Sequence, residues 1–189
     1  MARSATSLDQ PRYSRWVSVS HGTDALEPNL DMFIQGLGKL DAQLVHEDAA
    51  FQSLPFDVRA TVEESLKLTD RFTLSRLWVL GAYEVIRTLD QRARNRPTIL
   101  TRRLAGRVKT TKKAFERLRI PLAKLEPAKA YGTTDFASAR AAMHKELGIS
   151  WRVAQRIFVP RRRLSDRLLA LLTAIDEHQS RRSRRLTRA

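Results

Sequence analysis

The sequence predicts a mainly α fold: a bundle of four to six helices around a buried central helix, with room for one short β-strand pair. Apolar residues recur every three or four positions through most of the chain, which is the period of a helix with one buried face. The segment from Leu74 to Leu89 is apolar on nearly every side, as expected for a central helix. Hydrophobic residues make up 42% of the 189 residues, which is enough for the core of one domain.

The chain divides into three parts by composition. Residues 1–24 are polar and are expected to form a flexible or partly extended arm, in which the alternation at 15–20 also permits a short strand. Residues 25–179 are expected to form a single helical domain. Residues 180–189 contain five arginines and almost nothing to bury, which predicts a disordered basic tail.

Two long helices are expected in the first half of the domain. The first runs from about 29 to 51 with one apolar stripe, and Pro55 lies just after its end. The second runs from about 57 to 94 and either continues through 70–73 or breaks there. The stripe expected to face inward at its start consists of Val58, Val62 and Leu66.

The second half is expected to hold three further helices. One starts at Pro97, whose missing amide hydrogen costs nothing in a first turn, and ends at Pro121. Residues 121–134 form a connection. A short helix follows over 135–147, and a last one over 162–179.

The charge is distributed unevenly along the chain. The net charge of the whole protein is +15, yet residues 1–56 are acidic at −3 and residues 97–189 carry +16. This asymmetry indicates a polyanionic partner, which would be nucleic acid, an anionic membrane surface or an acidic protein. A codon bias towards arginine, combined with a solubilising tail, would give the same pattern.

Residues 140–158 resemble the helix-turn-helix motif of bacterial DNA-binding regulators. The turn is matched by Leu147-Gly148-Ile149-Ser150, in which the glycine would take a positive φ angle and Ser150 would cap the second helix. The resemblance implies that Trp151, Arg152, Gln155 and Arg156 project towards the major groove. The alternative is a β-strand over 150–158, paired with 15–20 or with part of 121–128, because Ile149, Trp151, Val153 and Ile157 alternate on one face.

Two further basic clusters complete the candidate nucleic-acid-binding set. One is the polar face of the helix around residue 109, and the other lies at the start of the last helix, where cations oppose the helix dipole and indicate a bound anion. The full set is Arg102, Arg103, Lys109, Lys112, Lys113, Arg152, Gln155, Arg156, Arg161, Arg162, Arg163 and Arg167.

Enzymatic motifs are scarce. Glu84 and Arg107 each interrupt an apolar surface, and we expect them to form a buried ion pair that fixes helix register rather than a catalytic pair. There is no cysteine, no phosphate-binding glycine loop and no zinc-binding histidine pair. No catalytic residue, metal site or cofactor is therefore predicted, and the sequence favours a protein that is not an enzyme.

The leading hypothesis is a non-catalytic nucleic-acid-binding protein, with a regulatory DNA-binding role if the motif at 140–158 is helical. The alternative is a helical protein–protein interaction module that docks an acidic partner through the same basic half. The longest apolar run, Leu77–Ile86, contains Glu84 and is half as long as the roughly 20 residues that a membrane span needs. With no apolar leader at the N-terminus, we expect a cytoplasmic protein without a membrane span.

Overall fold

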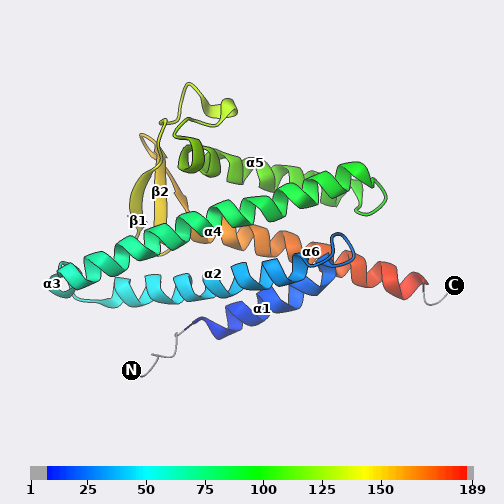
Figure 1. The fold of residues 1–189 in the computed structure, drawn as a ribbon, viewed down its shortest axis with the longest axis horizontal. Coiled ribbons are helices and arrows are strands. Elements are labelled where there is room, and N and C mark those ends of the chain that lie inside the picture. Colours follow the sequence, from blue (N-terminus) through cyan, green and yellow to red (C-terminus); the bar gives the residue numbers. More distant parts are fainter. Residues whose placement is uncertain (1–7, 187–189) are drawn as a thin grey trace.

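The computed structural model describes residues 8–186, and it confirms a mainly α fold with a small antiparallel sheet (Figure 1). The α-helices are α1 Gln10–Ser20, α2 Leu30–Ser53, α3 Phe56–Arg59, α4 Val62–Asn95, α5 Arg102–Lys124 and α6 Arg161–Leu186. Two short 3-10 helices are η1 His21–Thr23 and η2 Lys129–Tyr131. The strands are β1 Arg140–His144, β2 Gly148–Ala154 and β3 Ile157–Pro160.

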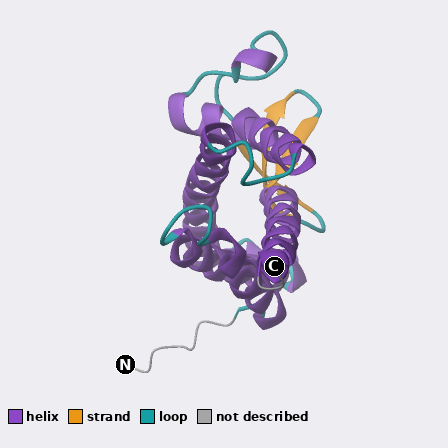
Figure 2. Cartoon of the chain, turned by 90° about the vertical axis from the view of Figure 1, so that its right-hand side faces the viewer, coloured by secondary structure: helices purple, strands orange, loops and turns teal. Residues whose placement is uncertain are grey.

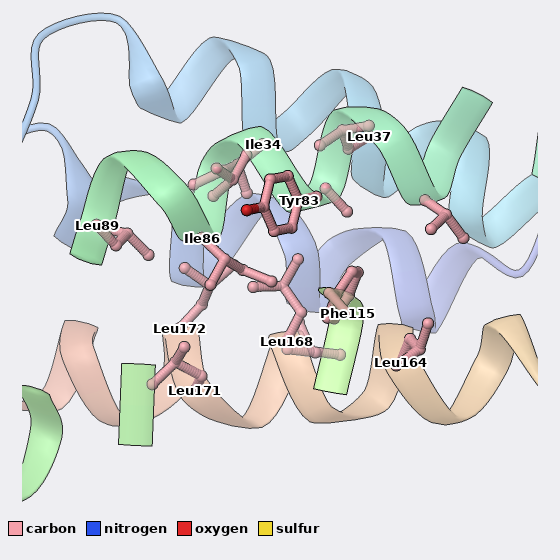
Figure 3. Close-up of a cluster of buried hydrophobic side chains, with 14 of the residues drawn as sticks. Ile34, Leu37, Tyr83, Ile86, Leu89, Phe115, Leu164, Leu168, Leu171 and Leu172 are labelled. Carbon is pink, nitrogen blue, oxygen red and sulfur yellow. The ribbon is translucent and has the colours of Figure 1, made fainter. Parts of the chain in front are cut away.

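The long helices pack in sequence around a shared core. α1 lies against α2, α2 against α4, α4 against α5, α5 against α6, and α6 returns to α1 and η1. Figure 2 shows the long helices side by side, viewed along the long axis of the molecule. Figure 3 shows the side chains that fill the centre, which come from α2, α4, α5 and α6. The labelled ones are Ile34, Leu37, Tyr83, Ile86, Leu89, Phe115, Leu164, Leu168, Leu171 and Leu172.

The predicted central helix is α4, which runs without a break from Val62 to Asn95. Its second half is buried around Trp78, whose ring meets those of Trp16 and Phe115 at centroid distances of 6.4 and 6.1 Å. α4 is not buried on every side, however, because Leu77 is 55% exposed.

The inward stripe predicted for the start of this segment is also wrong. α3 and the first turns of α4 project beyond the other helices (Figure 1), so their apolar side chains meet solvent. Val62 is 78% exposed and Leu66 is 64% exposed, with Phe56 of α3 at 79%.

The two prolines expected to bound α5 do not do so. Thr101 caps the helix by accepting a hydrogen bond from the Leu104 amide at 3.3 Å, and Pro97 lies in the preceding loop. Pro121 lies inside the last turn of α5 and does not end the helix. A proline so close to a helix end removes only one backbone hydrogen bond. The left-handed conformation of Leu125, with φ of 57°, follows as the C-cap.

The helix expected over 135–147 is wrong, and so is the helix-turn-helix interpretation, because this region forms a three-stranded antiparallel sheet in the order β1-β2-β3. The strand alternative is confirmed for β2, whose Ile149, Trp151 and Val153 point into the core. Its partners are β1 and β3, however, and not 15–20 or 121–128.

Gly148 does have the predicted positive φ, at 70°, but as the first residue of β2, directly after the β1–β2 turn. A β-carbon at this position would lie 2.1 Å from Oδ2 of Asp48, so a side chain is excluded as well. The Ile149 amide next to it donates to the same Asp48 oxygen at 3.1 Å. These contacts hold the β1–β2 hairpin against α2.

The termini differ from the expected arm and tail. Residues 10–20 are helical, with the Asp9 side chain capping α1 by accepting from the Arg12 amide at 3.0 Å. At the other end, α6 continues to Leu186, so residues 180–186 are helical as well. Residues 1–7 and 187–189 lie outside the described range. Among residues 8–186, no helix combines the length and apolar character needed to cross a membrane.

Candidate functional site

Three arginines from α5 and α6 meet in one groove. The groove has a volume of about 410 Å³, and Arg103, Arg107 and Arg167 line it together with small residues. Those small residues are Gly106, Thr110, Thr111 and Ala170. Arg107 donates to the Ala170 carbonyl at 3.1 Å, which ties the two helices together, and none of the described residues that line the groove is acidic.

A second groove lies on the other flank of α5, against α4. It has a volume of about 580 Å³ and is lined by five basic residues and two acidic ones. The basic residues are Arg94, Arg102, Lys109, Lys112 and Lys113, and the acidic residues are Asp90 and Glu116. Gly106 lines both grooves. Outside the backbone of its own helix, no described atom lies within 4 Å of the position that its β-carbon would take, so the part of α5 that separates the two grooves is low at this point.

The cations along α5 differ in how far they are neutralised. Lys112 is paired with Asp90 at 3.0 Å and with Glu116 at 3.7 Å, and these carboxylates raise the pKa of its ammonium, mainly through the hydrogen bond that Lys112 donates to Asp90. Six exposed residues of the predicted set on α5 and α6 make no ion pair with a carboxylate in the part of the chain that the structure describes. They are Arg102, Arg103, Lys109, Lys113, Arg163 and Arg167. With Arg107 they form what we call the basic α5–α6 surface.

Arg161 is a correction to the predicted set. Its side chain is 0% exposed, and its guanidinium binds Asp41 of α2 and lies 3.8 Å from Asp48. The charge at the start of α6 is thus offset inside the protein, so a bound anion is not needed to explain it. Arg162 is half-buried and Arg163 exposed, so the three consecutive arginines have different surroundings.

Asp41 is the centre of a buried polar network. Its carboxylate accepts hydrogen bonds from Arg12, from the Trp16 indole at 2.9 Å, from the Ser165 hydroxyl at 2.7 Å and from Arg161. Burial alone would raise the pKa of Asp41, but the Arg161 and Arg12 guanidiniums outweigh it and hold the pKa below its ordinary value. The network joins α1, α2 and α6.

Asp48, two helical turns further along α2, has the opposite shift. Burial raises the pKa of its carboxyl, and Arg161 and the Ile149 amide oppose this only in part. Sequence analysis missed both aspartates. The available signal was their spacing of seven residues within the apolar stripe of α2, a position where a carboxylate needs a buried partner.

The predicted buried pair of Glu84 and Arg107 is wrong. Glu84 pairs with Arg87, one turn along α4, at 2.5 Å, and its side chain is 42% exposed. Arg107 is exposed and binds the Ala170 carbonyl. Both residues lie on the edges of helix faces that the bundle leaves open.

The residues that the helix-turn-helix resemblance places on a recognition helix lie in the β2–β3 hairpin. Arg152 is on β2, across from Arg140 of β1 and Phe158 of β3. Gln155 and Arg156 lie exposed in the turn between β2 and β3. Within residues 8–186, no three histidine, aspartate or glutamate side chains are arranged to hold a metal ion.

Comparison with known proteins gives no match to a protein-family model, to a curated protein or to a solved structure.

Proposed function

We propose that this protein binds nucleic acid without catalysing a reaction on it, through the basic α5–α6 surface. The observation that carries the proposal is the groove in which Arg103, Arg107 and Arg167 converge with no carboxylate among its lining residues. Guanidinium groups match phosphate geometry, and a phosphate backbone supplies anions at regular spacing along such a surface.

The folding of α5 adds support, because its charges oppose helix stability. Arg102 and Arg103 occupy the first turn of α5, which contains no acidic residue. Cations there are repelled by the positive end of the helix dipole. An anion bound near this end would relieve both the repulsion from the dipole and that among the arginines.

The experiment is a titration of labelled duplex DNA and labelled single-stranded RNA, followed by fluorescence anisotropy at several salt concentrations. If six or seven cations contact phosphates, affinity falls by about 10³-fold between about 50 and about 200 mM salt. The variant R103Q/R107Q/R167Q should lower the magnitude of the slope of log K against log salt by about 2.7 on duplex DNA, or 0.9 per lost contact.

The matched control removes three charges elsewhere. Arg15 of α1, Lys39 of α2 and Lys145 in the β1–β2 turn are exposed and lie on other elements. The variant R15Q/K39Q/K145Q should retain the wild-type slope. Equal slopes for the two triple variants would overturn the proposal, and so would an affinity that changes less than about threefold over the same salt range.

An acidic protein partner is the alternative that the same experiment tests. The surface would then bind a carboxylate-rich protein, and purified protein would carry no nucleic acid. A ratio of absorbance at 260 and 280 nm expected for protein alone, together with no binding to either oligonucleotide at low salt, would favour that alternative.

A further inference from the structure

The outer face of the sheet carries a row of three large side chains in register. Arg140 of β1 pairs with Arg152 of β2, and Arg152 pairs in turn with Phe158 of β3. Residues directly opposite each other in antiparallel strands project to the same face, so all three belong to one surface. Phe158 is 46% exposed.

Phe136 adds a second aromatic ring to this row. Its amide donates to the Val153 carbonyl at 2.7 Å, which holds the residue beside β2 just before β1 begins. The guanidinium carbon of Arg140 lies 4.7 Å from the centre of its ring, and that of Arg152 lies 5.6 Å from it. We call Phe136, Arg140, Arg152 and Phe158 the sheet platform.

The electrostatics of the platform work against folding. Arg140 and Arg152 are like charges placed directly opposite each other, an arrangement that destabilises a strand pair. Neither makes an ion pair within residues 8–186, and Arg156 in the adjoining turn adds a third positive charge. Glu146 is the only acidic residue of the hairpin segment 140–160, and it lies in the opposite turn.

The two faces of the sheet therefore have different roles. Ile149, Trp151 and Val153 on the inner face are buried in the core and account for the stability of the sheet. The outer face has the exposed ring of Phe158 beside two arginines that make no ion pair within residues 8–186, which is what a ligand with flat apolar rings and negative charge would fit.

We propose that the sheet platform binds single-stranded nucleic acid, with an unpaired base stacked on Phe158 and the flanking phosphates held by Arg140, Arg152 and Arg156. This rests on the proposed function and specifies its substrate class. A duplex keeps its bases stacked on one another and offers no free ring face to a sheet, whereas single strands offer both ring faces and phosphates.

The sheet platform leads along the chain into α6, which carries part of the basic α5–α6 surface. β3 passes directly into α6 at Arg161, and the two elements are in contact (Figure 1). Phe158 and the exposed Arg163 are five positions apart in the sequence. A single strand held on the platform would have phosphate-binding groups supplied by the element that follows.

The test compares a labelled single-stranded oligouridine of about 12 nucleotides, within the span of known single-strand sites, with a duplex DNA of matched length. F158L keeps an apolar side chain but removes the ring. It should weaken oligouridine binding by about 5- to 100-fold, with the salt slope unchanged, because base stacking carries no charge. F158W should restore binding, since any aromatic ring can stack.

The controls separate this inference from the proposed function. F56L removes an exposed phenylalanine on α3 and should leave oligouridine affinity unchanged. R152Q should reduce the magnitude of the salt slope on oligouridine by about 0.7. Thermal melts of each variant confirm that it is folded.

Each outcome decides one of the two proposals. Wild-type affinity of F158L for oligouridine, or an equal loss on oligouridine and duplex, overturns the platform while R103Q/R107Q/R167Q still tests the groove. Absence of salt-dependent binding in the wild-type protein overturns the proposed function itself.

Discussion

Replacing Asp41 with asparagine should destabilise the protein more than any surface change. Asparagine has nearly the shape of aspartate but no charge, so the substitution removes the negative centre of the buried network without creating a cavity. Arg161 would then be fully buried with Asp48 as its remaining anionic neighbour, at 3.8 Å. Arg12 would keep its second partner, Asp166, at 2.7 Å.

The magnitude follows from what is left unpaired. The Asp41 carboxylate accepts four hydrogen bonds, and the single amide oxygen of asparagine can serve only part of this set while its NH₂ group meets other donors. Breaking a buried ion pair on one side costs about 3–5 kcal/mol. A domain with a free energy of unfolding of about 5–15 kcal/mol would lose a large share of it.

Urea denaturation followed by tryptophan fluorescence measures this loss. Thermal melting should show a decrease of roughly 6–20 °C, because 1 kcal/mol corresponds to about 2–4 °C at this chain length. The matched control is D166N, which removes an exposed carboxylate from the same arginine and should cost at most about 1 kcal/mol. A D41N variant within about 1 kcal/mol of wild type would refute the assignment of Asp41 as the charge that the network needs.

The pH dependence gives the same prediction a second measurement. The pKa of Asp41 is lowered in the folded protein, so its contribution is fully present above the unfolded value of about 3.9. That contribution is lost as the pH falls below this value towards the lower folded pKa. The free energy of unfolding of the wild type should therefore decline below about pH 4 more steeply than that of D41N.

Four further substitutions test other parts of the structure by the same denaturation assay. Gly36→Ala should stabilise α2 by about 0.5–1 kcal/mol, because the added β-carbon meets nothing within 4 Å outside the backbone of its own helix. Gly38→Ala should destabilise the protein, because its β-carbon would lie 2.3 Å from Trp16. Equal effects of the two substitutions would contradict the packing of α1 on α2. Gly148→Ala should cost at least about 1–2 kcal/mol from its positive φ alone, and a neutral result would place the turn elsewhere. Asp48→Asn should cost less than D41N, because burial raises the pKa of Asp48 and Arg161 and the Ile149 amide oppose this only in part, so its charge is less favourably placed than that of Asp41.

The long helices could be predicted from the sequence because each buries one face. A helix that buries one face has apolar residues every three or four positions. α2 and α4 follow that pattern closely, and their ends were placed within a few residues. The start of α4 shows the limit of this logic. The stripe of Val58, Val62 and Leu66 has the right period, yet no other element covers it, and periodicity alone carries no information about which partner is present.

The hairpin was ambiguous for a different reason. Over nine residues an alternating strand and a short helix can place the same apolar side chains inward, and Gly148 with positive φ fits the turn of either motif. In the structure, the amide of Ile149 at the start of β2 makes a long-range hydrogen bond to Asp48 on α2. Such a contact joins residues about a hundred positions apart and leaves no local trace in the sequence.

The candidate site was predictable in composition but not in arrangement. The charge on α5 was identified from its helical face, and Arg167 from its cluster on α6. That Arg103 and Arg167 share a groove depends on α5 and α6 packing side by side, which no spacing in the sequence specifies. The assignment of Arg161 to the surface failed because its partner, Asp41, lies 120 residues away.

Arg161 also lies at the junction between the two proposed binding surfaces. It is the first residue of α6, and Pro160 before it is the last residue of β3, so its burial against Asp41 fixes the point where the sheet meets the bundle. Phe158 lies on one side of this point and Arg163 on the other. A neutral residue in place of Arg161 would remove the desolvation cost of a buried charge. It would also remove the ion pair that connects the β3–α6 junction to α2. The buried ion pair of Arg161 and Asp41 thus adds to the Asp48 contacts that orient the sheet platform relative to the basic α5–α6 surface. A folded D41N protein should therefore lose affinity for a long single strand that spans both surfaces before it loses affinity for a short strand that contacts one.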